Sequence, residues 1–208
     1  MPGLSPSKSE VQRQAWRETA IERFTQSSET PTRFFELHAD RLSLACLAMA
    51  KRFERGGRLL VFGSGSSATD AQHVSVEFVH PVIVGKRALP AIALTNDIAS
   101  ILGVAQSSGV DEIFAQQLRL LGIGNDIALG LSLAADDPSV RAGLHEAKTR
   151  GMLTIGLGGG CATAASGWDF EFTVPSNDPY VIQEVQETVY HILWETVHVF
   201  FEHKDLLA

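Results

Sequence analysis

The sequence predicts an α/β fold in which a doubly wound, five-stranded parallel sheet is flanked by helices. Short apolar runs recur at residues 58–63, 89–95, 126–132, 152–157 and 170–175, and each is bounded by Gly, Pro, Asn or Asp, as buried strands are. Helix-patterned stretches lie between most of these runs, which indicates βαβ units and therefore parallel strands. The chain has 208 residues and is 45% hydrophobic, enough for one such domain with helical additions.

The N-terminal region predicts a tail and two helices. Residues 1–9 hold two prolines, a glycine and three serines, so we expect a flexible tail, followed by one domain over residues 10–208 with an N-terminal helical extension. Amphipathic patterns predict helices over about 11–24 and 31–55. Thr30 and Pro31 are typical of an N-cap and a first helical position, so a turn over 27–31 should separate the two helices.

The remaining helices are expected between and after the strands. The pattern places them near residues 67–79, 97–106, 110–121 and 138–150, with a long last helix over 179–203. The N-terminal helices and the last helix are additional to the sheet core. Such additions often form oligomer interfaces, so we expect a homo-oligomer.

Composition excludes several function classes. The formal net charge of −7 argues against a nucleic-acid partner, because phosphate backbones require clustered Lys and Arg. No apolar stretch is as long as a membrane span, and the first residues lack the apolar core of a secretory signal. The two cysteines, Cys46 and Cys161, form no CxxC motif, which predicts a reducing, cytoplasmic location.

A glycine-serine loop follows the first predicted strand. In open α/β sheets, ligands bind beyond the carboxyl ends of the strands. Glycines let a backbone approach an anion closely, while hydroxyls and helix N-terminal amides donate to it. The loop is neither a Walker A motif nor GxGxxG, and a tight turn that only packs the next helix is the alternative. The candidate ligand-binding residues are Ser64, Gly65, Ser66 and Ser67.

Two helical stretches carry possible metal ligands at one-turn spacing. His73 and Glu77 lie on the helix after the loop, and Gln183, Glu187 and His191 lie on the last helix. Positions four apart share one helix face, so each stretch directs its polar groups one way. Taken singly, each residue is more simply a surface or hydrogen-bonded side chain. If the two faces meet, they form a site of two imidazoles, a carboxylate and an amide beside the glycine-serine loop.

Together these segments resemble the sugar isomerase (SIS) family, and within it the phosphoheptose isomerase branch, over roughly residues 35–200. The matching motifs are Gly63-Ser64-Gly65-Ser66-Ser67, Asp70-Ala71-Gln72-His73 with Glu77, the strand and loop ending in Asn96-Asp97, and the last helix from Gln183 to His191.

The resemblance implies a site and an assembly. It implies a flavodoxin-like fold with one zinc ion per site, bound by His73, Glu77, Gln183 and His191. It implies Glu77 as base and His191 as acid, and a tetramer with sites between subunits. It also implies a sugar or sugar phosphate held by Ser64, Gly65, Ser66, Ser67, Asn96, Asp97, Ser132 and Gln183.

The chain departs from the family pattern at one loop. The family's third strand runs into Ser-x-Ser-Gly-x-Ser, which holds the sugar phosphate, whereas this chain keeps Ser132 but has Ala134 and Asp137 in place of the later serines. Asp137 before Pro138 is typical of an N-cap with proline at the first helical position. Its carboxylate would occupy the helix amides and repel a phosphate at a cost of about 1 to 4 kcal/mol per unit-charge pair at about 4 Å.

Three functional interpretations follow. The first is a phosphoheptose isomerase-like enzyme, converting sedoheptulose 7-phosphate to D-glycero-D-manno-heptose 7-phosphate with zinc. The second is an isomerase of a sugar that lacks the usual phosphate. The third is a non-catalytic sugar-binding or regulatory protein, like the DnaA-binding branch of the family. That branch keeps the phosphate-type loop and loses the Glu and His, the reverse of the pattern here.

Overall fold

A computed structural model describes residues 8–160, 167–203 and 205 of the chain. Its centre is a five-stranded sheet in the order β2-β1-β3-β4-β5, with every pairing parallel. The strands are β1 (Leu59–Gly63), β2 (Ala91–Ala93), β3 (Ile127–Leu131), β4 (Leu153–Gly159) and β5 (Phe170–Val174). All five coincide with the predicted apolar runs, so the doubly wound parallel sheet is confirmed.

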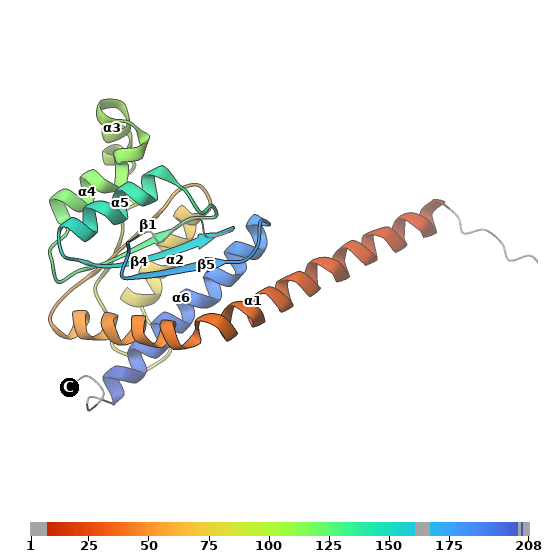
Figure 1. Cartoon of the computed structure of the whole chain (residues 1–208), viewed down its shortest axis with the longest axis horizontal. Coiled ribbons are helices and arrows are strands. Elements are labelled where there is room, and N and C mark those ends of the chain that lie inside the picture. Colours follow the sequence, from red (N-terminus) through yellow and green to blue (C-terminus); the bar gives the residue numbers. More distant parts are fainter. Residues whose placement is uncertain (1–7, 161–166, 204, 206–208) are drawn as a thin grey trace, which may run out of the picture.

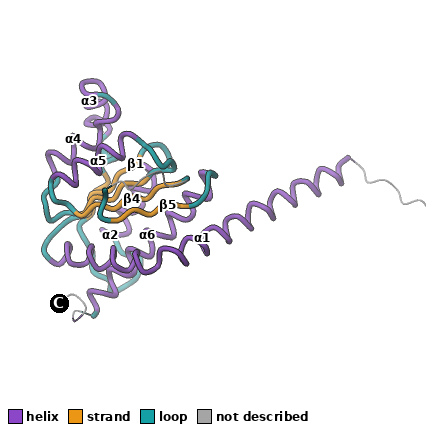
Figure 2. Tube along the Cα trace, viewed as in Figure 1, coloured by secondary structure: helices purple, strands orange, loops and turns teal. Residues whose placement is uncertain are grey.

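Helices cover both faces of this sheet (Figure 1). On one face lie α1 (Lys8–Glu54), α2 (Ser67–Val79) and α6 (Pro179–Glu202). On the other face lie α4 (Ile113–Leu121) and α5 (Pro138–Thr149), with α3 (Ile98–Ser108) and a short 3₁₀ turn, Val110–Glu112, beyond them. The tube view shows the strands enclosed between these two helical layers (Figure 2).

The N-terminal region differs from the prediction. Residues 1–7 of the expected tail lie outside the described residues, and α1 already begins at Lys8. One continuous helix runs through Pro31 where two helices and a Thr30 N-cap were expected, so that prediction was wrong. Beyond Pro31, Phe34 is fully buried, and on the other side Arg23 lies 2.9 Å from Glu184 of α6.

These tertiary contacts explain why the helix continues. Proline in a helix interior costs about 3 kcal/mol, because it removes one hydrogen bond and its ring crowds the preceding turn. Contacts on both sides of Pro31 offset that local preference. The first half of α1 otherwise extends away from the body of the molecule (Figure 1) and leaves Trp16 and Phe24 largely exposed.

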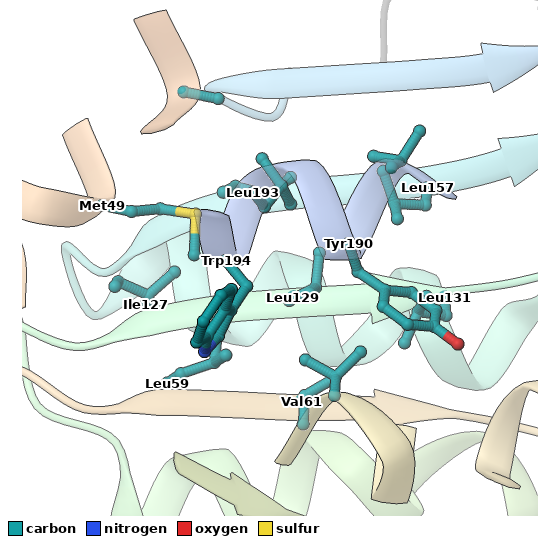
Figure 3. Close-up of a cluster of buried hydrophobic side chains, with 14 of the residues drawn as sticks. Met49, Leu59, Val61, Ile127, Leu129, Leu131, Leu157, Tyr190, Leu193 and Trp194 are labelled. Atoms are coloured by element: carbon teal, nitrogen blue, oxygen red, sulfur yellow. The ribbon is translucent and has the colours of Figure 1, made fainter. Parts of the chain in front are cut away.

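The main core lies between the sheet and the layer of α1, α2 and α6. Figure 3 shows Leu59 and Val61 of β1 with Leu129 and Leu131 of β3 facing α6. The intervening residues Leu60, Phe62 and Ala128 pack on the opposite layer, as the alternation of side chains along a strand requires. Burying one such side chain contributes about 1.5 to 3 kcal/mol. The strands are therefore buried on both faces, which explains their continuous apolar runs.

The strand order places the ligand crevice. The chain moves from β1 outward to β2 on one side, then returns to β3 on the other side of β1. The carboxyl ends of β1 and β3 therefore border the topological switch point, where doubly wound sheets bind ligands. The loop after β1 and the loop after β3 meet there. None of the described helices is both long and apolar enough to cross a membrane.

Candidate functional site

Helices α2 and α6 bring the two predicted histidines together. The ring centroids of His73 and His191 lie 5.3 Å apart, although the residues are far apart in sequence. Helix α2 is fixed by Ala71, Val74 and Phe78, which are buried on the face next to the one that carries the site residues. Helix α6 is fixed in the same way by Val185, Val189 and Leu193. The amphipathic patterns of both helices thus place their polar faces against each other.

His73 is held from two sides. Its Nε2 atom lies 3.4 Å from Oε1 of Glu77, one turn further along α2. Its Nδ1 atom lies 3.0 Å from the phenolic oxygen of Tyr190. Burial, with the negative charges of Asp70, Glu187 and Glu77, raises the pKa of Tyr190, so the phenol stays neutral. In Figure 3 the Tyr190 ring lies beside Leu131, at the carboxyl end of β3.

A group of possible metal ligands forms around the histidine pair. One ligand atom from each of His73, Glu187 and His191 lies within 4.8 Å of the others. Ligand atoms on one tetrahedral zinc lie about 3.3 Å apart, so small side-chain rotations would bring this group to a common ion. Two imidazoles and a carboxylate are a donor set that suits zinc. The residues present therefore fit the expected metal.

Gln183 is oriented by a buried carboxylate. Its Nε2 atom donates to both carboxylate oxygens of Asp70, at 3.1 and 2.9 Å. Burial raises the pKa of Asp70, while the hydrogen bond from Gln183 opposes that shift. Because the amide nitrogen is engaged, the amide oxygen of Gln183 is the atom available to a metal or a sugar hydroxyl. Asp70 thus fixes the orientation of the Gln183 side chain, in the arrangement that carboxylates take behind a ligand.

The loop after β1 has the geometry of a close backbone approach. A side chain at Gly63 would collide with the carbonyl oxygen of Leu131 at 2.7 Å, so only glycine fits there. Gly65 has a φ of +59°, which glycine adopts without strain. Ser66 is exposed, whereas the hydroxyl of Ser67 is buried and has no hydrogen-bond partner among the described residues.

The loop after β3 is tied to the loop after β1 by Asp137. Its Oδ1 atom accepts hydrogen bonds from the backbone amides of Ser139 and Val140, and its Oδ2 atom accepts one from the hydroxyl of Ser64. The predicted N-cap is therefore confirmed. Burial would raise the pKa of Asp137, but the hydrogen bonds from Ser64, Ser139 and the two amides outweigh it and hold that pKa below its usual value.

The other predicted substrate residues are spread around this edge of the sheet. Ser132 is buried, and its hydroxyl accepts a hydrogen bond from the amide of Ala134 at 3.0 Å. Asn96 and Asp97 are exposed after β2, where Asp97 caps α3 by accepting from the Ser100 amide at 3.1 Å. The capping role of Asp97 gives it a structural function besides the predicted contact with substrate.

Sequence reasoning assigned no role to Asp70 or Tyr190, and Glu187, although a possible metal ligand by its spacing, was outside the zinc set that the resemblance implied. Glu187 shares a face with Gln183 and His191, so its spacing was a usable signal. Asp70 was noticed only as part of a motif, and a buried acid early in a helix carries no pattern that names its partner. Tyr190 lies among the apolar positions of α6, so its pattern indicates a core residue. Only the packing of α2 against α6 shows that its hydroxyl reaches His73.

Comparisons with known proteins agree with this architecture. The model of the SIS domain family matches residues 24–159. The chain is 37% identical over 171 residues to a phosphoheptose isomerase of Solidesulfovibrio magneticus, covering 82% of this chain and 84% of that protein. A phosphoheptose isomerase of Roseiflexus is 35% identical over 178 residues, covering 85% and 90% of the two chains.

Solved structures show the same likeness. The structure of a phosphoheptose isomerase from Francisella tularensis superposes with a TM-score of 0.79 at 32% identity, covering 86% of this chain and 96% of that one. One from Neisseria gonorrhoeae superposes equally well, with a TM-score of 0.79, but is 24% identical and supports the fold alone. The family model, the identity to these relatives and the shared fold agree. The chain therefore belongs to the SIS domain family and is a homologue of the phosphoheptose isomerases.

Proposed function

We propose that this protein is an aldose–ketose isomerase of the phosphoheptose isomerase type. The observation that carries the proposal is the meeting of His73 and Glu77 on α2 with Gln183 and His191 on α6. The reference reaction is the conversion of sedoheptulose 7-phosphate to D-glycero-D-manno-heptose 7-phosphate. A ketose with the same reacting carbons but no phosphate would undergo the same chemistry, because the phosphate lies far from C1 and C2.

The reaction moves one proton between neighbouring carbons through an enediol. Glu77 takes a proton from C1 of the open-chain ketose. The electron pair of the broken C1–H bond forms the C1–C2 double bond, and the carbonyl electrons move to the C2 oxygen. His191 donates a proton to that oxygen. Glu77 then returns its proton to C2, while His191 takes the proton of the C1 hydroxyl, which leaves an aldehyde at C1. No atom is gained or lost, and Glu77 and His191 end in their starting protonation states.

The same residues would hold zinc. His73, His191 and the amide oxygen of Gln183 are the shared candidates, with Glu77 as the predicted carboxylate ligand and Glu187 as a second carboxylate that lies with the histidines. When bound, zinc supplies Lewis-acid polarisation of the sugar's carbonyl and hydroxyl oxygens. A carboxylate bound to a metal is a weaker base, so a metal contact through Glu187 would leave Glu77 free to take the proton.

The proposed assembly is a tetramer with sites between subunits. Several exposed apolar side chains support an interface: Trp16 and Phe24 on α1, Ile98 and Leu102 on α3, and Val82 and Val84 after α2. Light scattering of the purified protein tests the number of subunits directly.

Turnover tests the function. The purified protein is incubated with zinc and either sedoheptulose 7-phosphate or sedoheptulose, and the aldose product is measured by chromatography. We expect aldose from at least one of them, and none from Glu77→Gln with an unchanged circular dichroism spectrum. Absence of product from both sugars would contradict the proposal and favour a non-catalytic sugar-binding protein.

A further inference from the structure

The crevice between β1 and β3 is where a doubly wound sheet with this strand order receives its ligand. Two groups that normally hold an anion meet there: the glycine-serine loop after β1 and the N-terminus of α5 after β3. In this chain both are engaged by one internal carboxylate. Asp137 accepts from the amides at the start of α5 and from the hydroxyl of Ser64.

The hydrogen-bonding capacity of this carboxylate is nearly filled. Oδ1 accepts from the Ser139 amide at 3.0 Å, the Val140 amide at 3.1 Å and the Ser139 hydroxyl at 2.7 Å. Oδ2 accepts from Ser64, which leaves one further position for a donor. A sugar hydroxyl can donate there. A phosphate dianion has no proton to donate and brings a like charge instead.

The charges around Asp137 do not reverse this preference. Arg141 lies on the first turns of α5, but its Nε atom is 3.0 Å from the carboxylate of Asp136 and its guanidinium lies over the Trp168 ring. Asp136 and Glu171 add further negative charge near the same loop. The neighbouring positions Ala134 and Ala135 have no side-chain donors. The crevice is therefore acidic, and the two α5 amides that face it are already used by Asp137.

We propose that Asp137 determines substrate choice by replacing the anion in this crevice, so that the sugar isomerised here presents a hydroxyl, not a phosphate, to the β1–β3 crevice. This inference rests on the proposed isomerase function for its reaction. Asp137 touches the far end of the sugar and takes no part in the proton transfer. It favours an unphosphorylated ketose or aldose over its phosphate ester.

The test compares two ligands that differ only in the phosphate. Sedoheptulose and sedoheptulose 7-phosphate are titrated calorimetrically into zinc-loaded protein in a Glu77→Gln background, which prevents turnover. We expect sedoheptulose to bind at least about ten times more tightly than its phosphate, since one pair of like charges at about 4 Å weakens binding by roughly fivefold or more. Asp137→Ser and Asp137→Asn should reverse the order, because both keep an N-cap and remove the charge.

A matched control comes from the start of α6. Asp178 caps that helix through the amides of Tyr180 and Val181 and is also followed by proline, so Asp178→Asn removes the same charge from the same type of cap outside the crevice. It should leave the preference between the two sugars unchanged. Circular dichroism verifies that each variant is folded.

The outcomes separate the two proposals. Tighter binding of sedoheptulose 7-phosphate by the wild-type crevice, or an unchanged preference in both Asp137 variants, would overturn this inference while leaving the isomerase function standing. If sedoheptulose binds more tightly than its phosphate but the protein with Glu77 unchanged turns over neither sugar, only the isomerase function would be contradicted. Failure of both sugars to bind at millimolar concentration would overturn both.

Discussion

The phenolic oxygen of Tyr190 lies 3.0 Å from Nδ1 of His73, joining the two helices that form the site. A histidine that binds a metal through one ring nitrogen commonly donates a hydrogen bond from the other, which fixes the ring. The phenolic oxygen of Tyr190 has a lone pair that accepts this bond when Nδ1 of His73 carries the proton. The contact therefore favours metal binding through Nε2 of His73.

Tyr190→Phe should weaken zinc binding without unfolding the protein. Loss of such a partner typically costs 10- to 100-fold in metal affinity, roughly, since the ring orientation is no longer fixed. Competition with a chromophoric chelator measures the affinity. Tyr180→Phe is the control, because Tyr180 is 69% exposed on the same helix. Equal zinc affinities in the two variants would show that Tyr190 does not position His73.

Glu187 and Glu77 should separate metal binding from proton transfer. Glu187 belongs to the His73–His191 ligand group, so Glu187→Gln should lower zinc affinity by about tenfold or more, and excess zinc should restore turnover. Glu77→Gln should abolish turnover at every zinc concentration. Glu184→Gln serves as a control one turn earlier, where the carboxylate pairs with Arg23. Full turnover by Glu77→Gln would exclude Glu77 as the base.

Asp137 should make stability depend on pH in the acid range. Its folded pKa lies below the unfolded value of about 3.9, so its contribution is present above that pH and is lost as pH falls through the folded pKa. We expect the free energy of unfolding of wild type to exceed that of Asp137→Asn by about 1 kcal/mol at pH 6. The difference should shrink below about pH 4 in urea titrations. A pH-independent difference would contradict the ionic role.

Pro31 should destabilise the continuous helix that contains it. Pro31→Ala restores a backbone donor inside α1 and should stabilise the protein by up to about 3 kcal/mol. A thermal melt should show a higher Tm. Pro2→Ala, in the region before α1, is a control for the general effect of removing a proline. An unchanged or lower Tm for Pro31→Ala would indicate that α1 is interrupted there in solution.

The strands were predictable because burial on both faces leaves continuous apolar runs, as in residues 127–131. The interruption of α1 was predicted wrongly because Pro31 is a strong local signal, while the contact of Arg23 with Glu184 joins residues far apart in sequence. The Asp137 cap was predictable because Asp-Pro acts within one helical turn. The reach of Asp137 to Ser64 was not, since it depends on the juxtaposition of β1 and β3.

The site shows the same division between local and tertiary information. One-turn spacing was enough to place His73 and Glu77 on one face of a helix, and Gln183 and His191 on another. The roles of Asp70 and Tyr190 depend on the packing of α2 against α6, which no local pattern encodes. The cysteine expectation stays a prediction, because Cys46 is buried and Cys161 lies outside the described residues.

Solvent deuterium exchange tests the central claim most directly. While the proton taken by Glu77 is held on its carboxyl group, it can exchange with D₂O, so deuterium enters C1 of the recovered ketose or C2 of the aldose, and nuclear magnetic resonance detects it at both positions. We expect incorporation by the zinc-loaded wild-type protein with sedoheptulose or sedoheptulose 7-phosphate, and none by Glu77→Gln. Exchange at the wild-type rate in Glu77→Gln, or neither exchange nor aldose formation with either sugar, would contradict the assignment of this site as an aldose–ketose isomerase centre.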